Sequence, residues 1–162
     1  MHDVLEQFID WSRSHGWQVD ATDGPDVALP PVIASRYRVP DEYVRFLSRV
    51  RVAVNQGRTK WLLCVSDFDA KPEDEFRWNE YEIISLDAAD ADHDEKWAAT
   101  IRGFWDNHLP FCMSVDDMYE YYAFDLANGT IVQGCEPEFE DTTPVANSFD
   151  EFLAKVMSGE LL

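Results

Sequence analysis

His108 and Cys112 come nearest to a catalytic pair, because an imidazole beside a thiol can generate a nucleophile. Pro110, however, interrupts any helix between them, and no third group is placed to orient the histidine. As zinc ligands the two side chains would lack partners, since zinc takes four ligands, or three and a water. We therefore expect no catalytic cysteine and no bound metal.

An acidic segment, "DADHD" at residues 90–94, copies the alternating acids that open a calcium-binding EF-hand loop. Glu95 stands where that loop needs a glycine, and Ile101 stands where it needs a bidentate glutamate. The segment is typical instead of a solvated loop that precedes a helix.

A second acidic segment, "CEPEFED", contains Glu136, Glu138, Glu140 and Asp141. If a strand continues past Pro137, the three glutamates share one face, where paired carboxylates could act as acid and base on a glycoside. Charges at a sheet edge also block unwanted strand pairing. We rank edge protection first, a patch for a protein partner second and catalysis third.

Motifs for other chemistries are absent from the sequence. It contains no GxGxxG or GxxxxGK[ST] motif for nucleotides and no GxSxG elbow for a nucleophilic serine. Ser114 in "CMSVDD" lacks the strand-turn-helix context that such a serine needs. We expect no cofactor.

The cysteines and the first residues indicate where the protein works. Cys64, Cys112 and Cys135 lie in apolar runs without disulfide or zinc spacing, which favours buried, reduced thiols. The start, "MHDVLEQFIDW", has acids where a signal peptide needs basic residues, and no apolar run is long enough for a membrane span. We expect a cytoplasmic protein.

Hydrophobic periodicity and turn residues predict the elements that position these side chains. We expect amphipathic helices at 3–15 and 40–51, with an irregular segment at 17–39 between them. Buried strands are expected at 60–68 and 81–86, separated by a charged loop at 67–79. A helix containing Trp97 and Ile101 follows, then a strand at "PFCMSV", and finally a helix capped by Ser148 and ended by Gly159.

The stretch "YEYYAFDLANGTIVQG" predicts a hairpin with Asn128-Gly129 as a two-residue type I′ turn. That turn pairs Leu126 with Ile131, Phe124 with Gln133, and Tyr122 with Cys135. Both faces of its first strand are apolar, so we expect a central strand that is covered on both sides.

These elements predict an α+β fold: one domain over residues 1–162, with an antiparallel or mixed central sheet flanked by helices, the sheet and its helices occupying 60–159.

The net charge of −19 is distributed unevenly. Residues 1–60 contain eight acidic and eight basic side chains, whereas residues 61–162 contain 24 acidic and five basic ones. Such a field repels nucleic acid and anionic membranes and attracts basic proteins, although a well-solvated surface explains acidity alone.

Three segments, "VPDEYVRFL", "FWDNHLPFCMSVDDMYEYYAFDL" and "GTIVQGCEPEFEDTTPVANSFDEFL", resemble the SUKH superfamily, which includes bacterial immunity proteins and fungal cell-wall-assembly regulators. The resemblance spans roughly residues 37–159, and the segment "RVAVNQGRTKW" departs from it by lacking the Asn-Gly-Gly type of turn common in the family. It implies a non-enzymatic protein that binds and neutralises a toxin, often a nuclease.

With the charge distribution, the resemblance predicts a basic toxin domain as the partner, bound through an acidic surface. The candidate partner-binding residues are Asp116, Asp117, Glu136, Glu138, Glu140 and Asp141. The competing surface is a positive stripe on the second helix and its flanks, formed by Arg36, Arg38, Arg45, Arg49 and Arg51. The competing functions are a small carboxylate-dependent hydrolase and a regulatory scaffold.

Overall fold

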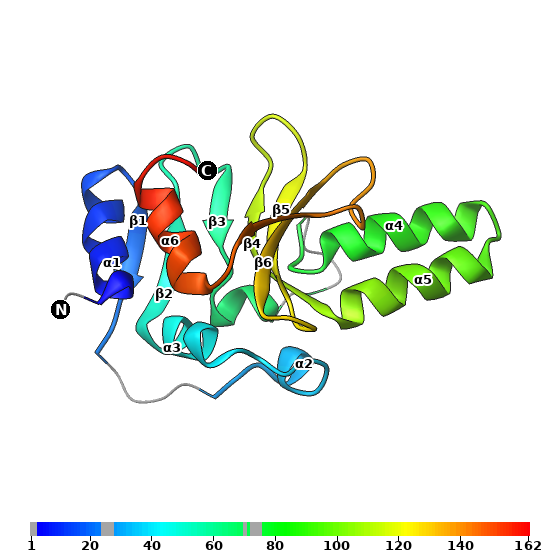
Figure 1. Cartoon of the computed structure of the whole chain (residues 1–162), viewed down its shortest axis with the longest axis horizontal. Helices are drawn as coiled ribbons and strands as arrows, with labels where there is room; N and C mark the ends of the chain where they lie inside the picture. The colour runs from blue at the N-terminus through cyan, green and yellow to red at the C-terminus, as the bar shows by residue number, and fades with distance from the viewer. Residues whose placement is uncertain (1–2, 24–27, 70, 72–75) are drawn as a thin grey trace.

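Seven strands form one sheet with helices on both of its faces in this computed structural model, which describes residues 3–23, 28–69, 71 and 76–162 (Figure 1). The helices are α1 (Val4–Ser14), α2 (Pro31–Ala34), α3 (Asp41–Arg49), the 3-10 helix η1 (Val65–Phe68), α4 (Glu80–Ala91), α5 (Glu95–Asp106) and α6 (Phe149–Met157). The strands are β1 (Gln18–Ala21), β2 (Val50–Val54), β3 (Lys60–Leu62), β4 (His108–Ser114), β5 (Glu120–Asp125), β6 (Thr130–Cys135) and β7 (Thr143–Ala146).

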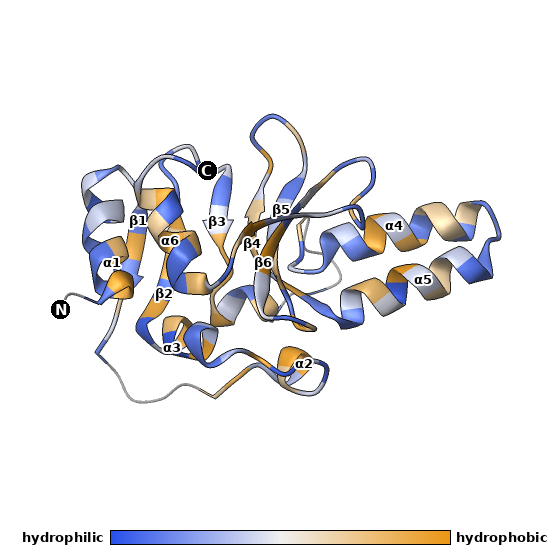
Figure 2. Cartoon of the chain, viewed as in Figure 1, coloured by the Kyte–Doolittle hydropathy of each residue, from blue (hydrophilic) through white to orange (hydrophobic). Residues whose placement is uncertain are grey.

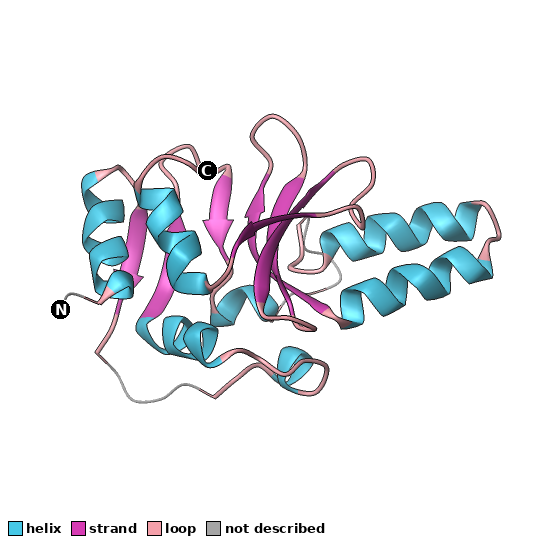
Figure 3. Cartoon of the chain, viewed as in Figure 1, coloured by secondary structure: helices cyan, strands magenta, loops and turns pink. Residues whose placement is uncertain are grey.

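The sheet follows the order of the chain, and every strand is antiparallel to the next (Figure 3). The sheet is open, with β1 and β7 at its edges. This arrangement confirms the predicted α+β class and resolves "antiparallel or mixed" to antiparallel.

Strand β5 shows how the two faces are covered, because alternate side chains of a strand point to opposite sides. Tyr122 and Phe124 contact α6 through Phe152 and Phe149. Tyr121 points the other way, with its ring 4.9 Å from that of Trp105 in α5. The prediction of a central strand buried on both faces is confirmed.

The ends of the helices follow from local sequence. Ser148 caps α6 by accepting a hydrogen bond from the amide of Glu151, as predicted. Asp3 caps α1 in the same way, through the amide of Leu5. Helix α3 begins after Pro40 and ends at Arg49, two residues earlier than the predicted boundary, because Val50 already starts β2.

The hairpin forms, but its predicted register is wrong. Phe124 pairs with Ile131, Tyr122 with Gln133, and Asp125 with Thr130. Four residues therefore connect the strands, and the amide of Gly129 donates a hydrogen bond of 2.8 Å to the carbonyl of Asp125 that closes the turn. Gly129 has a φ of +78°. The register is displaced by two residues, so each side chain stays on its expected face.

The strand predicted at 81–86 is a helix. A short apolar run fits a buried helix as well as a buried strand. The buried residues of α4 are Tyr81, Glu82, Ser85 and Ala89, and the spacing of four between Tyr81, Ser85 and Ala89 places these three on one side of the helix. Helices α4 and α5 pair with each other and extend together beyond the sheet as an arm, defined here as residues 80–106 (Figure 1).

Other boundaries also differ. The strand predicted at 60–68 ends at Leu62 and is followed by η1, and the segment predicted to be irregular at 17–39 contains β1 and α2. Residues 24–27 of that segment, and 70 and 72–75 of the charged loop predicted at 67–79, lie outside the described residues. No helix in the described ranges is both long and apolar enough to cross a membrane.

Replacing Phe124 by Ala should lower the free energy of unfolding by about 3–5 kcal/mol, as for other buried aromatic residues. Phe124 is only 2% exposed, and its ring lies 4.7 Å from that of Phe111 and 5.4 Å from that of Tyr43. Urea melts measure the loss. The control is Val32→Ala at a residue 42% exposed, with an expected change below about 0.5 kcal/mol. A loss under about 1 kcal/mol for Phe124→Ala would contradict the central position of β5.

Candidate acidic interface

Two loops that are separate in sequence lie side by side at one end of the sheet. The first joins β4 to β5 at residues 115–119, and the second joins β6 to β7 at residues 136–142. Since β5 and β6 are antiparallel neighbours, the start of one lies beside the end of the other. The amide of Tyr119 donates to Oε1 of Glu136 at 2.9 Å, and the amide of Glu136 donates to the carbonyl of Tyr119 at 2.9 Å. Figure 2 shows both hydrophilic and hydrophobic colouring along the first loop, whose sequence is Val-Asp-Asp-Met-Tyr.

Five of the six predicted interface residues are exposed on these loops. They are Asp116 and Asp117 on the first loop and Glu136, Glu138 and Asp141 on the second. The strand does not continue past Pro137, because β6 ends at Cys135, so the three glutamates do not share a strand face. The loops, rather than a strand, therefore bring these carboxylates together.

Glu140, the sixth residue, points inward. Its Oε2 accepts hydrogen bonds from Oγ of Ser85 at 2.9 Å and from Nε1 of Trp105 at 3.0 Å. Burial raises the pKa of this carboxyl above its ordinary value, and the two hydrogen bonds offset part of that rise. Glu140 thus attaches the second loop to α4 and α5, and it is less exposed than the other five.

Aromatic packing against α4 fixes the position of the second loop. The buried ring of Phe139 stacks on Tyr81 of α4, with ring centroids 4.5 Å apart and planes 10° apart. The hydroxyl of Tyr121 donates to the carbonyl of Phe139, and that of Tyr81 donates to the carbonyl of Ser114 at 3.0 Å. Both acidic loops therefore rest on the same layer of tyrosines.

An open groove runs between the arm and the second loop. It encloses about 450 Å³, and its lining residues are Ile84, Ser85, Ala88, Trp97, Pro137, Glu138, Phe139, Glu140 and Asp141. Four large hydrophobic side chains are exposed in the described part of the chain, and three of them are Trp97 in this groove and Met118 and Tyr119 on the first loop. Exposed aromatic and methionine side chains are enriched in protein interfaces.

Sequence reasoning missed the exposure of these three side chains. It predicted a helix containing Trp97 and Ile101, and α5 confirms that helix. Ile101 is buried, whereas Trp97 is 39% exposed because the arm extends past the sheet at that point. No clear signal in the sequence indicates this exposure, because the apolar run at 81–86 has no helical period from which a helical hairpin could be recognised.

The competing basic stripe is largely neutralised within the chain. Arg36 forms a bidentate pair with the buried carboxylate of Glu82, both contacts being 2.8 Å, and Nε of Arg36 lies 3.0 Å from Asp106. Hydrogen bonding to Glu82 raises the pKa of Arg36 further. Arg45 pairs with Asp3 and Arg49 with Glu6 on α1. Arg51 donates to the carbonyl of Leu47 at 3.4 Å, and Arg38 is exposed.

His108 and Cys112 do not form a reactive pair. Nδ1 of His108 lies 2.7 Å from the carbonyl of Phe104, and Nε2 lies 3.8 Å from Asp125. Cys112 is fully buried, and burial raises the pKa of its thiol. Such a thiol stays protonated and unreactive.

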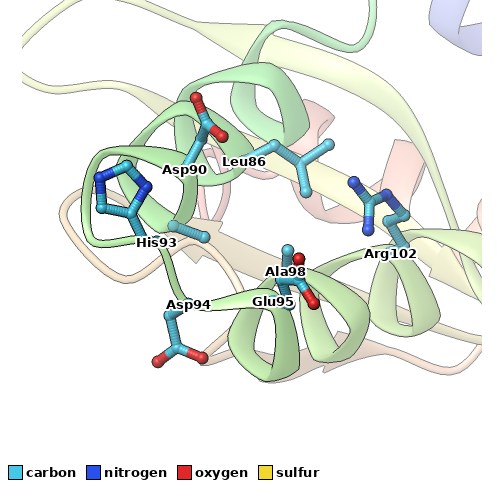
Figure 4. A pocket seen from close by; sticks show the side chains of 8 residues that line it. Leu86, Asp90, His93, Asp94, Glu95, Ala98 and Arg102 are labelled. Atoms are coloured by element: carbon cyan, nitrogen blue, oxygen red, sulfur yellow. The ribbon is translucent and has the colours of Figure 1, made fainter.

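The segment 90–94 lies at the far end of the arm, where α4 ends and α5 begins. A depression there is bordered by Asp90, Asp94 and Arg102, and Figure 4 shows the carboxylates of Asp90 and Asp94 pointing away from one another. Within the described ranges, no group of three or more His, Cys, Asp or Glu residues could hold a metal ion.

Replacing Glu140 should separate its role as an acceptor from its charge. Glu140→Ala leaves the donors of Ser85 and Trp105 unpaired, so we expect a loss of about 1–3 kcal/mol in the free energy of unfolding. Glu140→Gln keeps an oxygen acceptor and removes the charge that burial disfavours, so its stability at pH 7 should equal or exceed that of the parent. Glu138→Gln, on the exposed surface, is the control.

The pH dependence provides the second readout for Glu140. Because its pKa is raised above 4.5 in the folded chain, the folded state binds this proton more tightly than the unfolded state. The resulting stability is fully present below pH 4.5 and is lost as the pH rises through the raised pKa. Denaturant melts of the Gln variant should lack this decline. Equal profiles for parent and variant would contradict the raised pKa.

One of the comparisons with known proteins found a match, to a protein family. The SMI1/KNR4 family (SUKH-1) matches over residues 35–155, which includes both acidic loops, the arm and most of the sheet. No curated protein and no solved structure matched the chain. The family match covers well over half of the sequence, so the chain belongs to the SMI1/KNR4 family (SUKH-1).

Proposed function

We propose that the protein is a binding module that acts as an immunity protein, attaching to a cognate basic toxin domain through its two acidic loops and so neutralising it. Membership of the SMI1/KNR4 family supports a non-enzymatic protein-binding role. The observation that most supports the proposal is the pair of hydrogen bonds between Tyr119 and Glu136, which joins the two loops. It creates one surface with five exposed carboxylates from two separate segments.

Two further features favour this surface over the rest of the molecule. Met118 and Tyr119 supply exposed apolar area among the carboxylates, and aromatic residues commonly dominate the binding energy of an interface. The alternative basic surface is weakened because Arg36, Arg45 and Arg49 already hold acidic partners. A nuclease, whose cleft must be cationic to hold phosphates, is a toxin class with matching charge.

The raised pKa of Glu140 is the observation that favours the alternative hydrolase. A general acid needs such a pKa and also a proton within reach of a substrate. The Oε2 atom of Glu140 is already engaged by two donors, and its pKa follows from burial at that structural contact. Protein binding therefore accounts for the arrangement better than hydrolysis.

Association kinetics test the proposed interface once a pull-down from the native host has supplied the toxin. Asp117 and Glu138 are exposed, one on each loop, so reversing both to Lys should slow association about tenfold and flatten its dependence on salt. Asp10→Lys with Asp20→Lys makes the same change of charge at exposed residues of α1 and β1 and should have a much smaller effect.

A different result would contradict the assignment of the interface to the acidic loops. If the Asp117 and Glu138 reversals leave the association rate unchanged while Arg45→Glu or Arg49→Glu abolishes binding, α3 is the binding face. Thermal melts of each variant establish that it is folded before its kinetics are compared. A captured partner without a cationic surface would contradict the choice of a basic toxin.

A further inference from the structure

We infer that the groove between the arm and the second loop binds an arginine side chain of the partner protein. This inference rests on the proposed function, because that function supplies a basic protein at the adjoining loops. The groove adjoins them through Pro137 and Glu138, which belong to the second loop and also line the groove. A partner held on the carboxylates of the loops therefore has this groove within reach.

One side of the groove suits the apolar part of an arginine. Trp97 of α5 is 39% exposed there, and Ile84 and Ala88 of α4 lie with it on the lining. A guanidinium is planar and weakly hydrated, so it stacks on an indole face, while its aliphatic stem contacts alkyl groups. The volume of about 450 Å³ falls within the range of small-ligand pockets.

The other side of the groove supplies the charge. Glu138 and Asp141 are exposed at its edge, and Glu140 is held back by Ser85 and Trp105. None of the described residues that line the groove is basic, so the two exposed carboxylates have no counter-charge within it. A guanidinium presents several N–H donors in a fixed plane and can bond carboxylates while it stacks. An ammonium can also be attracted to an indole face, but it has no plane with which to stack and no fixed fork of donors, which makes arginine the preferred occupant over lysine.

The test uses N-acetyl-arginine amide as a probe of the intact chain, followed by NMR. We expect saturable shifts of the Trp97 indole N–H and of the amides of Glu138 and Asp141, smaller shifts with N-acetyl-lysine amide, and none with N-acetyl-citrulline amide, which keeps the shape without the charge. Trp97→Ala should weaken the binding about two- to fivefold, as expected of an exposed cation–π contact. Glu138→Gln with Asp141→Asn should abolish saturation.

Asp87→Asn is the matched control, because it removes an exposed carboxylate from α4 outside the groove and should leave the titration unchanged. Equal shifts with the citrulline amide, shifts spread evenly over all acidic segments, or full binding in Trp97→Ala would each overturn the inference. The probe contains no toxin, so these outcomes do not depend on the loop-reversal kinetics. If reversing Asp117 and Glu138 slows association but the arginine amide does not saturate, the proposed function stands and this inference fails.

Discussion

The close contact between Tyr121 and Gly134 is the constraint on which the acidic surface depends. A Cβ atom at position 134 would lie 2.5 Å from the hydroxyl of Tyr121, so only glycine leaves room for the ring over its neighbouring strand. With the ring in that place, the hydroxyl reaches the carbonyl of Phe139 and fixes the path of the chain after β6. Phe139 then stacks on Tyr81, which joins the second loop to the arm. The absence of a side chain at Gly134 therefore determines the position of the carboxylates on the second loop.

Polar contacts also hold the second loop and the arm in place, because the buried polar groups of these segments need hydrogen-bond partners. Glu140 satisfies donors from both helices of the arm, and Arg36 ties Glu82 of α4 to the segment before α3. Buried polar groups are costly when unpaired, so such contacts specify one position of the arm more sharply than apolar packing alone. The acidic loops are thus supported by elements that come from three different parts of the sequence.

The sequence was sufficient for much of the fold, since capping residues and amphipathic spacing are local signals. The helix after Ser148, the hairpin and an antiparallel or mixed sheet were predicted from capping residues, turn residues and hydrophobic spacing. The helix at 80–91 was not, because "YEIISL" has no period long enough to distinguish a helix from a buried strand. The hairpin register failed because Asn-Gly signals a two-residue turn, whereas Asp125 and Asn128 instead bond the backbone of a four-residue loop.

The candidate site likewise contains some features that local sequence predicts and others that it does not. The exposed acids of the loops could be named from residue type and turn position, but the inward direction of Glu140 depends on Ser85 and Trp105, which lie 55 and 35 residues away. The neutralisation of Arg45 and Arg49 likewise depends on α1, more than 40 residues earlier in the chain. Contacts of that sequence separation are set by tertiary packing and leave no local pattern to read.

The ion pairs between α1 and α3 also shape the electric dipole of the molecule. They cancel charge around α1, whereas the arm, at the opposite end of the molecule in Figure 1, has eight acidic against two basic side chains in residues 80–106. A cationic protein that approaches from any direction exerts a torque on such a dipole and rotates the arm and the acidic loops toward itself. Orientation then begins before contact, within the screening length of the solution, and it reduces the number of unproductive collisions that precede a correct one.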